Sequence, residues 1–196
     1  MRLFAALRPD PRVVEHLVSA LRPIRDTATA SLRWPDPDQW HVTCAFYGEV
    51  PDGSLDAHAT RVAAAARRVD ALGLSLRGAG SFADRTLWIG VGGDLTALRM
   101  LMEACSDHET AQHRRAHLTV ARARPRPDPR TGGRRASGRR LRDGGDLPSI
   151  VRALSVYTGP TWIAREVELV RSELGKGRSG GPRHTVVGSF PFGPTI

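Results

Sequence analysis

The spacing of apolar residues alternates along the chain between a period of about two and a period of about 3.6, which predicts strands separated by helices. Arg2–Leu7 is a short, almost continuous apolar run and predicts a strand. Asp10 and Pro11 predict a helix start, because Asp accepts hydrogen bonds from the free amides of a first turn and Pro fits its first position. Apolar residues follow at helical spacing at Val14, Leu17, Val18 and Leu21.

The same pattern predicts the remaining elements. Further strands are expected over residues 39–47, 72–82, 86–91, 116–122, 162–174 and 184–192. Further helices are expected over 54–69, after Asp94 and over 147–156. Helices that separate antiparallel strand pairs in two similar halves predict an α+β fold. We expect two pseudo-symmetric lobes of antiparallel β-sheet with outer helices around a central cleft, in a single domain over residues 1–196.

Residues 123–146 break this pattern, since arginine, glycine and proline dominate the segment and large apolar residues are almost absent. Such a composition buries too little apolar surface to order a backbone, so we expect a long, mobile, basic loop. The loop is either a contact for a polyanion or a solvated insertion without a role. The whole chain has a formal net charge of +9, and of its 29 basic residues only Lys176 is a lysine. Guanidinium groups donate bidentate hydrogen bonds to phosphate, so this balance favours polyanionic partners.

Several classes of protein are excluded by the distribution of apolar residues and cysteines. No apolar run approaches the roughly 18 residues that a membrane helix needs, and the apolar stretch at the start is too short for a signal peptide. The two cysteines, Cys44 and Cys105, form neither a disulfide framework nor a zinc pattern. We expect a cytoplasmic monomer with no cofactor, no metal and no membrane partner.

Two short segments of the chain share a His-x-Thr pattern inside a strand-like run, at His41–Thr43 and His117–Thr119. Side chains two apart on a strand share one face, about 7 Å from each other. Two such strands at one cleft would supply two imidazoles and two hydroxyls, a set suited to cutting a phosphodiester without metal. The alternative is two half-exposed strand histidines with satisfied hydrogen bonds. His113 and His117 also have the spacing of a helical zinc pair, but the strand prediction for His117 argues against a metal.

With these paired motifs the chain resembles the 2H phosphoesterases, and within them the RNA 2',3'-cyclic phosphodiesterases, also called 2'-5' RNA ligases. The likeness runs nearly from end to end, although the family usually has Leu at the place of Cys44 and often Pro at the place of Ala116. The matching segments are residues 2–7, Trp34, and residues 41–50, 78–82, 87–91, 115–122, 167–174 and 190–192.

The resemblance implies roles that the residues alone leave open, because two similar motifs give no polarity. It implies that His41 is the proton donor to the 3' oxygen and that His117 is the proton acceptor for water, which leaves a 2'-phosphate. Histidine suits both tasks because its pKa lies near neutral pH. Thr43 and Thr119 would donate hydrogen bonds to the non-bridging oxygens. The same geometry used in reverse would form a 2'-5' linkage.

Four further residues are candidates for substrate contact or for the core. Arg122 is a candidate phosphate clamp, provided that its strand ends or bulges there; its alternative is a surface salt bridge. Arg115 falls on the cleft face and would contact phosphate or solvent. Strict alternation places Tyr47 on the cleft face as a platform for a base, and Phe46 in the core. The other histidines are expected at the surface: His16, His58, His108 and His184.

Three functions remain open at this point. The first is a metal-independent cyclic phosphodiesterase acting on RNA ends. The second keeps the chemistry but uses a small nucleotide such as an ADP-ribose cyclic phosphate. The third is a non-catalytic RNA-binding module, which the two complete His-x-Thr pairs disfavour because a binder needs no general acid and base. The basic loop favours RNA over the small nucleotide.

Overall fold

The computed structural model describes residues 1–27, 32–106, 115–124, 147–177 and 181–193. The strands are β1 (Arg2–Leu7), β2 (Leu32–Arg33), β3 (Val42–Glu49), β4 (Leu72–Phe82), β5 (Thr86–Gly93), β6 (His117–Ala123), β7 (Thr158–Ala164), β8 (Glu166–Glu173) and β9 (Arg183–Pro191). The helices are α1 (Pro11–Thr27), α2 (Leu55–Ala66), α3 (Leu95–Cys105) and α4 (Leu147–Ala153), with 3₁₀ turns at Pro37–Gln39 and Asp52–Ser54. No helix in the described part of the chain is both long and apolar enough to cross a membrane.

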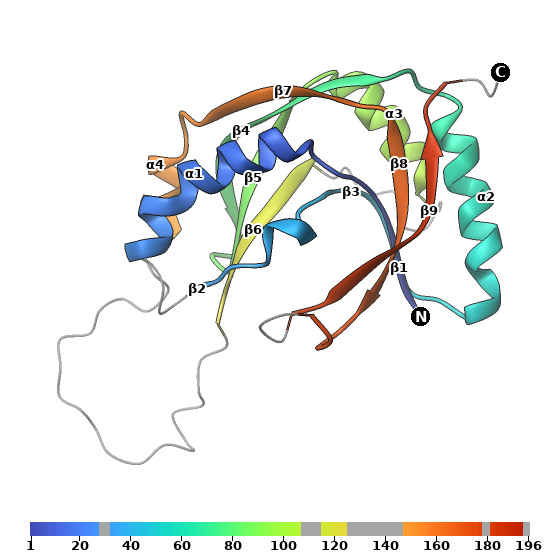
Figure 1. Ribbon diagram of the computed structural model, residues 1–196, viewed down its shortest axis with the longest axis horizontal. Helices are drawn as coiled ribbons and strands as arrows, with labels where there is room; N and C mark the ends of the chain where they lie inside the picture. Colours follow the sequence, from blue (N-terminus) through green and yellow to red (C-terminus); the bar gives the residue numbers. More distant parts are fainter. Residues whose placement is uncertain (28–31, 107–114, 125–146, 178–180, 194–196) are drawn as a thin grey trace, which may run out of the picture.

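The nine strands of the described residues join one curled antiparallel sheet (Figure 1). Its order is β7-β4-β5-β6-β3-β1-β8-β9, and β2 pairs with β6 outside this path. The two strands that carry the His-x-Thr motifs, β3 and β6, are neighbours where the two halves of the sheet meet. Helix α1 packs against β7 and α4 against β4, while α3 packs against β3 and α2 against β8 and β9. The expected α+β fold, with two antiparallel halves and outer helices, is confirmed.

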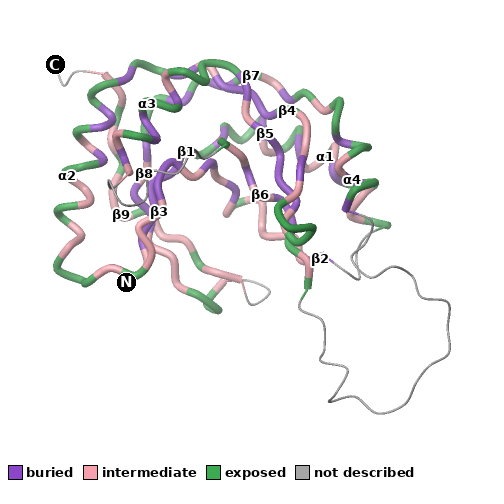
Figure 2. The backbone as a smooth tube through the Cα atoms, turned by 180° about the vertical axis from the view of Figure 1, so that it is seen from behind, coloured by how far each residue is buried: buried purple, intermediate pink, exposed green. Residues whose placement is uncertain are grey.

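Buried residues are concentrated in the strands of the middle of the sheet (Figure 2), and they form two apolar clusters. The main core lies between the sheet and its helices, and from α1 it takes Val13, Leu17 and Leu21. A smaller cluster on the other face consists of Phe4, Ala6 and Val170, with Phe46 packed against it. Strand β1 therefore buries residues on both faces, which explains why its sequence is an almost continuous apolar run.

The expected single strand over residues 162–174 is wrong, because the structure divides it at Arg165. β7 pairs with β4 at one edge of the sheet, whereas β8 pairs with β1 in the other half. One straight strand cannot pair in both places, but the curl of the sheet lets β7 lead into β8 through one residue. The final helix is also shorter than expected and ends at Ala153. The expected basic loop lies outside the described residues from position 125 to 146.

Strand β3 contains a bulge directly after its motif. Two successive residues of β1 pair with Thr43 and Ala45, so Cys44 is an extra residue in β3. A bulge of this kind interrupts the alternation of side chains between the two faces. Cys44 and Ala45 both join the main core, and the next residue, Phe46, packs on the opposite face.

Strand β6 repeats this irregularity at the same place in its motif. Two successive residues of β5 pair with Thr119 and Ala121, so Val120 is the extra residue. Val120 and Ala121 both join the main core. Arg122 therefore returns to the face that carries Thr119, although strict alternation would place it on the other one.

Candidate active site

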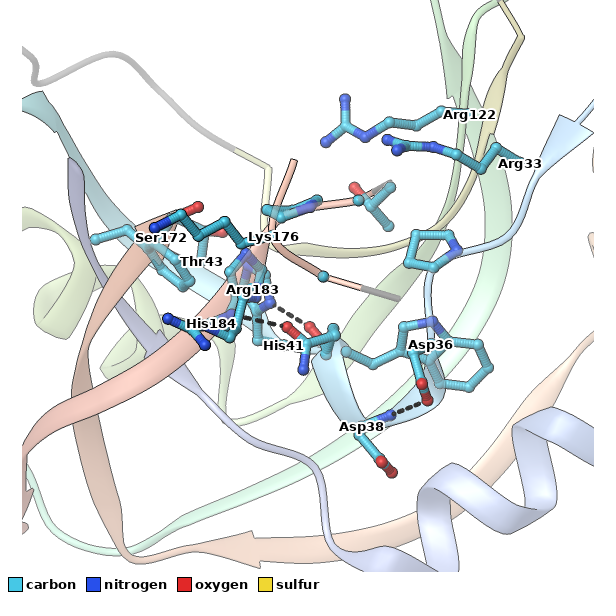
Figure 3. Close-up of a pocket in the computed structure, with 18 of the residues that line it drawn as sticks. Arg33, Asp36, Asp38, His41, Thr43, Arg122, Ser172, Lys176, Arg183 and His184 are labelled. Atoms are coloured by element: carbon cyan, nitrogen blue, oxygen red, sulfur yellow. Dashed lines mark hydrogen bonds between the residues drawn. The ribbon is translucent and has the colours of Figure 1, made fainter. Parts of the chain in front are cut away.

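A cavity of about 480 Å³ lies on the face of the sheet opposite the helices, beside the junction of β3 and β6 (Figure 3). Strands β1, β3 and β6, the segment before β3, and the hairpin between β8 and β9 form its walls. Its charged and polar lining includes Arg2, Arg33, Asp36, Asp38, Gln39, His41, Thr43, Thr119, Arg122, Ser172, Lys176, Arg183 and His184.

The pairing of β3 with β6 brings the two motifs together. Val42 and Leu118, the middle residues of the motifs, lie directly opposite each other. In an antiparallel pair this register places the His of each motif beside the Thr of the other, on the face that both share. Side chains in such positions have Cβ atoms about 5 Å apart. The two motifs thus form one group of two imidazoles and two hydroxyls.

Each motif histidine is fixed by the same backbone contact. Nδ1 of His41 lies 2.7 Å from the carbonyl oxygen of Gln39, and Nδ1 of His117 lies 2.8 Å from that of Arg115. A carbonyl oxygen only accepts, so Nδ1 carries the proton in both rings. In the neutral imidazole, Nε2 is then left with its lone pair, and it is the nitrogen that exchanges a proton with a ligand.

His41 lies in the more enclosed of the two environments. Its ring stacks on Phe4, with ring centroids 4.7 Å apart, and meets His184 edge-on at 5.2 Å. Burial, with smaller contributions from the positive charges of His184 and Arg8, lowers the pKa of His41 from 6.5 to about 4. The hydrogen bond to Gln39 acts in the opposite direction but is the weaker effect.

His117 lies beside the cavity and is not among the residues that line it. Its ring meets Phe82 edge-on at 4.9 Å and lies 6.0 Å from the ring of Trp88. Burial also lowers the pKa of His117, and the charge of Arg122 acts in the same direction. Both motif histidines are therefore neutral in the free protein at pH 7. An anion bound between them would raise both pKa values, because an opposite charge favours the imidazolium form.

The lowered pKa of His41 predicts a loss of stability at acidic pH. Unfolded His41 binds a proton at a pKa of about 6.5 and native His41 only near 4, so the free energy of unfolding falls as the pH drops between these values. From pH 7 to pH 4.5 this one residue should remove about 2–3 kcal/mol. His41→Gln lacks the titration, and urea unfolding of both proteins at the two pH values isolates its contribution. An equal pH dependence in both proteins would contradict the assignment.

Arg122 lies at the cavity because of the bulge in β6, which meets the condition set from the sequence. It pairs with Arg33 across β2 and β6, and both side chains reach into the cavity next to each other (Figure 3). Burial and the neighbouring charge of Arg33 lower the pKa of Arg122. Two adjacent guanidinium groups repel each other, and an anion between them would relieve this repulsion.

The expectations for Tyr47 and Phe46 are both wrong, since the bulge in β3 exchanges their faces. Phe46 lines the cavity. Tyr47 packs against the main core, and its hydroxyl donates to the carbonyl oxygen of Cys105 at 2.9 Å. Arg115 is exposed and lies outside the cavity lining, with its guanidinium 5.0 Å from the centre of the Trp88 ring.

Several residues that line the cavity are not marked as site residues by any pattern in the sequence. His184, expected at the surface, lies against Phe4 and His41, and its backbone amide donates to Oε1 of Gln39 at 3.0 Å. Lys176 and Arg183 come from the hairpin between β8 and β9, where both pair with Glu173. These residues are far in sequence from the motifs, so only the strand order brings them together. Of the other histidines, His16 is exposed and bonded to Tyr157, His58 contacts Tyr47, and His108 lies outside the described residues.

In the part of the chain that the structure describes, no group of three or more His, Cys, Asp or Glu side chains is arranged to hold a metal ion. His113, the second member of the possible zinc pair, lies outside that part. The residues around the cavity supply histidine, threonine and arginine, which fits acid–base chemistry on a bound anion.

Comparisons with known proteins agree with this fold. The LigT like Phosphoesterase family matches residues 7–91. RNA 2',3'-cyclic phosphodiesterase of Geobacillus stearothermophilus is 34% identical over 99 residues, which cover 45% of this chain and 32% of the relative. The enzyme of the same name from Methanothermobacter thermautotrophicus is 30% identical over 95 residues, which cover 46% of this chain and 51% of the relative. The chain thus spans a third to a half of the length of these curated relatives.

Solved structures match the chain over almost its whole length. A protein of Thermus thermophilus superposes with a TM-score of 0.68 at 24% identity, covering 98% of both chains. E. coli LigT complexed with phosphate superposes with a TM-score of 0.65 at 19% identity, again over 98% of both chains. The fold is that of the LigT-like phosphoesterases. The family match confirms the resemblance of residues 7–91 to the LigT-like phosphoesterases.

Proposed function

We propose that this protein hydrolyses the 2',3'-cyclic phosphate end of RNA to a 2'-phosphate, without a metal. The observation that carries the proposal is the facing pair of His-x-Thr motifs, in which both histidines are held through Nδ1 and keep Nε2 for the ligand. The names of the two curated relatives support the substrate class. We place the enzyme in the cytoplasm as a monomer.

The two histidines divide the proton transfers of the reaction. His117 Nε2 removes a proton from water as the water oxygen bonds to phosphorus. His41 Nε2 gives a proton to the 3' oxygen as the bond between that oxygen and phosphorus breaks. The bound substrate has one negative charge, which raises the low pKa of His41 and lets it carry the proton that it donates. The product keeps its phosphate on the 2' oxygen.

The hydroxyls and the arginine stabilise the charge that builds up on the phosphate. Thr43 and Thr119 donate hydrogen bonds to the non-bridging oxygens, where their effect is largest in the transition state. Arg122 binds the same group from the wall of the cavity. If a 5'-hydroxyl of a second RNA replaces the water, the same steps form a 2'-5' linkage. The site would then act as a 2'-5' RNA ligase.

A short RNA that ends in a 2',3'-cyclic phosphate tests the proposal directly. With excess EDTA present, we expect hydrolysis at an unchanged rate and a 2'-phosphate product, identified by phosphorus NMR. The double variant His41→Ala/His117→Ala, purified in the same way, controls for contaminating nucleases. A rate that falls with EDTA would contradict the metal-free mechanism, and a 3'-phosphate product would contradict the polarity of the two histidines. Hydrolysis of an ADP-ribose cyclic phosphate but not of RNA would favour the small-nucleotide alternative.

A further inference from the structure

A second hollow lies beside the candidate active site and shares a wall with it. This hollow, of about 590 Å³, is open to solvent between the end of α1 and strand β2. Arg33 and Trp34 line both cavities, so the two adjoin at this segment. We call the second hollow the arginine groove and define it by Arg22, Arg25, Arg33, Trp34 and Arg124.

The arginine groove is strongly positive. Among the described residues that line it are the four arginines and only one acidic residue, Asp26. Within the described part of the chain, the structure records no ion pair between an acidic side chain and Arg22, Arg25 or Arg124. The guanidinium of Arg25 lies 5.6 Å from the centre of the Trp34 ring, which holds this side chain over the groove. A concave surface with this charge attracts an anionic ligand.

Arginine side chains line both the candidate active site and the groove. Arg122 lines the active-site cavity, and Arg33 is its direct partner across β2 and β6 (Figure 3). Arg33 also lines the groove, where Arg22, Arg25 and Arg124 continue the series. Neighbouring strands are about 5 Å apart, so the groove begins one side chain beyond the candidate phosphate clamp.

We propose that the arginine groove binds the phosphates of the nucleotides that precede the cyclic end, so that the substrate is an RNA strand of several nucleotides. This inference rests on the proposed function. A free mononucleotide occupies only the active-site cavity, so the groove adds nothing to its binding affinity. A strand gains one charge-assisted contact for each phosphate that an arginine meets. The bases of the strand can stack on Trp34, since stacking on an aromatic ring tolerates any base.

The double variant Arg22→Gln/Arg25→Gln tests the groove with two substrates. These are a 2',3'-cyclic mononucleotide and a ten-nucleotide RNA with a 2',3'-cyclic end. For the RNA we expect KM to rise about tenfold and the salt dependence of log KM to flatten by about 1.4, from 0.7 for each of two lost phosphate contacts. Turnover of the mononucleotide serves as the internal reference. The matched control is Arg67→Gln/Arg68→Gln, two exposed arginines after α2 that remove the same charge away from the groove.

The possible results separate the two proposals. An unchanged KM and salt dependence for the RNA in Arg22→Gln/Arg25→Gln, or an equal change in the control variant, would overturn the groove and leave the proposed function intact. If the wild-type protein hydrolyses neither substrate, the proposed function fails. The groove is then tested by fluorescence anisotropy with the same RNA carrying a plain 3'-phosphate, where weaker binding by the groove variant alone supports it. Equal competition by poly-glutamate in that assay would overturn RNA as the ligand.

Discussion

Replacement of His41 or His117 by alanine is expected to lower kcat on a cyclic-phosphate RNA end by about 10²- to 10⁴-fold, the usual loss for a general acid or base. KM should change little, because neither side chain holds the remainder of the RNA. The structure supports this because both rings are fixed through Nδ1, which leaves Nε2 of each ring for proton exchange. Steady-state rates on a short RNA give both constants.

The double variant distinguishes a cooperating pair from two independent residues. With both histidines removed, the loss should be far smaller than the product of the two single losses, because the acid and the base act in one step. His16→Ala is the matched control, since His16 is exposed on α1 and bonds to Tyr157 instead of facing the cavity. A single variant that keeps more than about a tenth of the wild-type kcat would show that its histidine is neither acid nor base.

Removing the motif hydroxyls is the second change with a large expected effect. Thr43→Val and Thr119→Val keep the shape of the side chain and delete the donor, and each should lower kcat by about 10²- to 10³-fold. The expected loss is this large because the hydrogen bond is strongest when charge builds up on the non-bridging oxygens. Stopped reactions analysed by chromatography provide the rates.

Thr161→Val makes the same chemical change on β7, at an exposed position outside the cavity. It should leave kcat unchanged, and urea unfolding of all three variants shows whether stability has been lost. A higher KM with an unchanged kcat would mean that the hydroxyls bind the ground state and the transition state equally.

The sequence predicts the elements around the motifs well, because burial there follows simple periods. Arg2–Leu7 is apolar throughout and forms a strand buried on both faces, and the spacing of Leu17 and Leu21 predicts the helix that packs on the main core. The second His-x-Thr motif lies in β6, and the first begins at His41, directly before β3, and continues into that strand. These results depend only on local alternation of side chains.

Sequence periodicity fails where tertiary contacts override alternation. A bulge adds one residue to a strand without a characteristic change in residue type. The sequence therefore does not indicate that Phe46 faces the cavity and Tyr47 the core. The break at Arg165 is hidden for the same reason, because apolar residues continue on both sides of it. His184 reaches His41 only through the pairing of β9 with β8 and of β8 with β1, which a local pattern does not contain.

The bulges in β3 and β6 also make the two sides of the active-site cavity chemically different. The paired histidines and threonines are related by an approximate two-fold axis, and on their own they would accept a cyclic phosphate in two opposite orientations. One orientation releases the 3' oxygen and the other the 2' oxygen, so a symmetric site would yield a mixture of isomers. Phe46 and Arg122 occupy equivalent places, each five residues after its histidine, but one presents an aromatic ring and the other a cation. A nucleoside therefore meets unlike surroundings in the two orientations, and this asymmetry provides a physical basis for a single product.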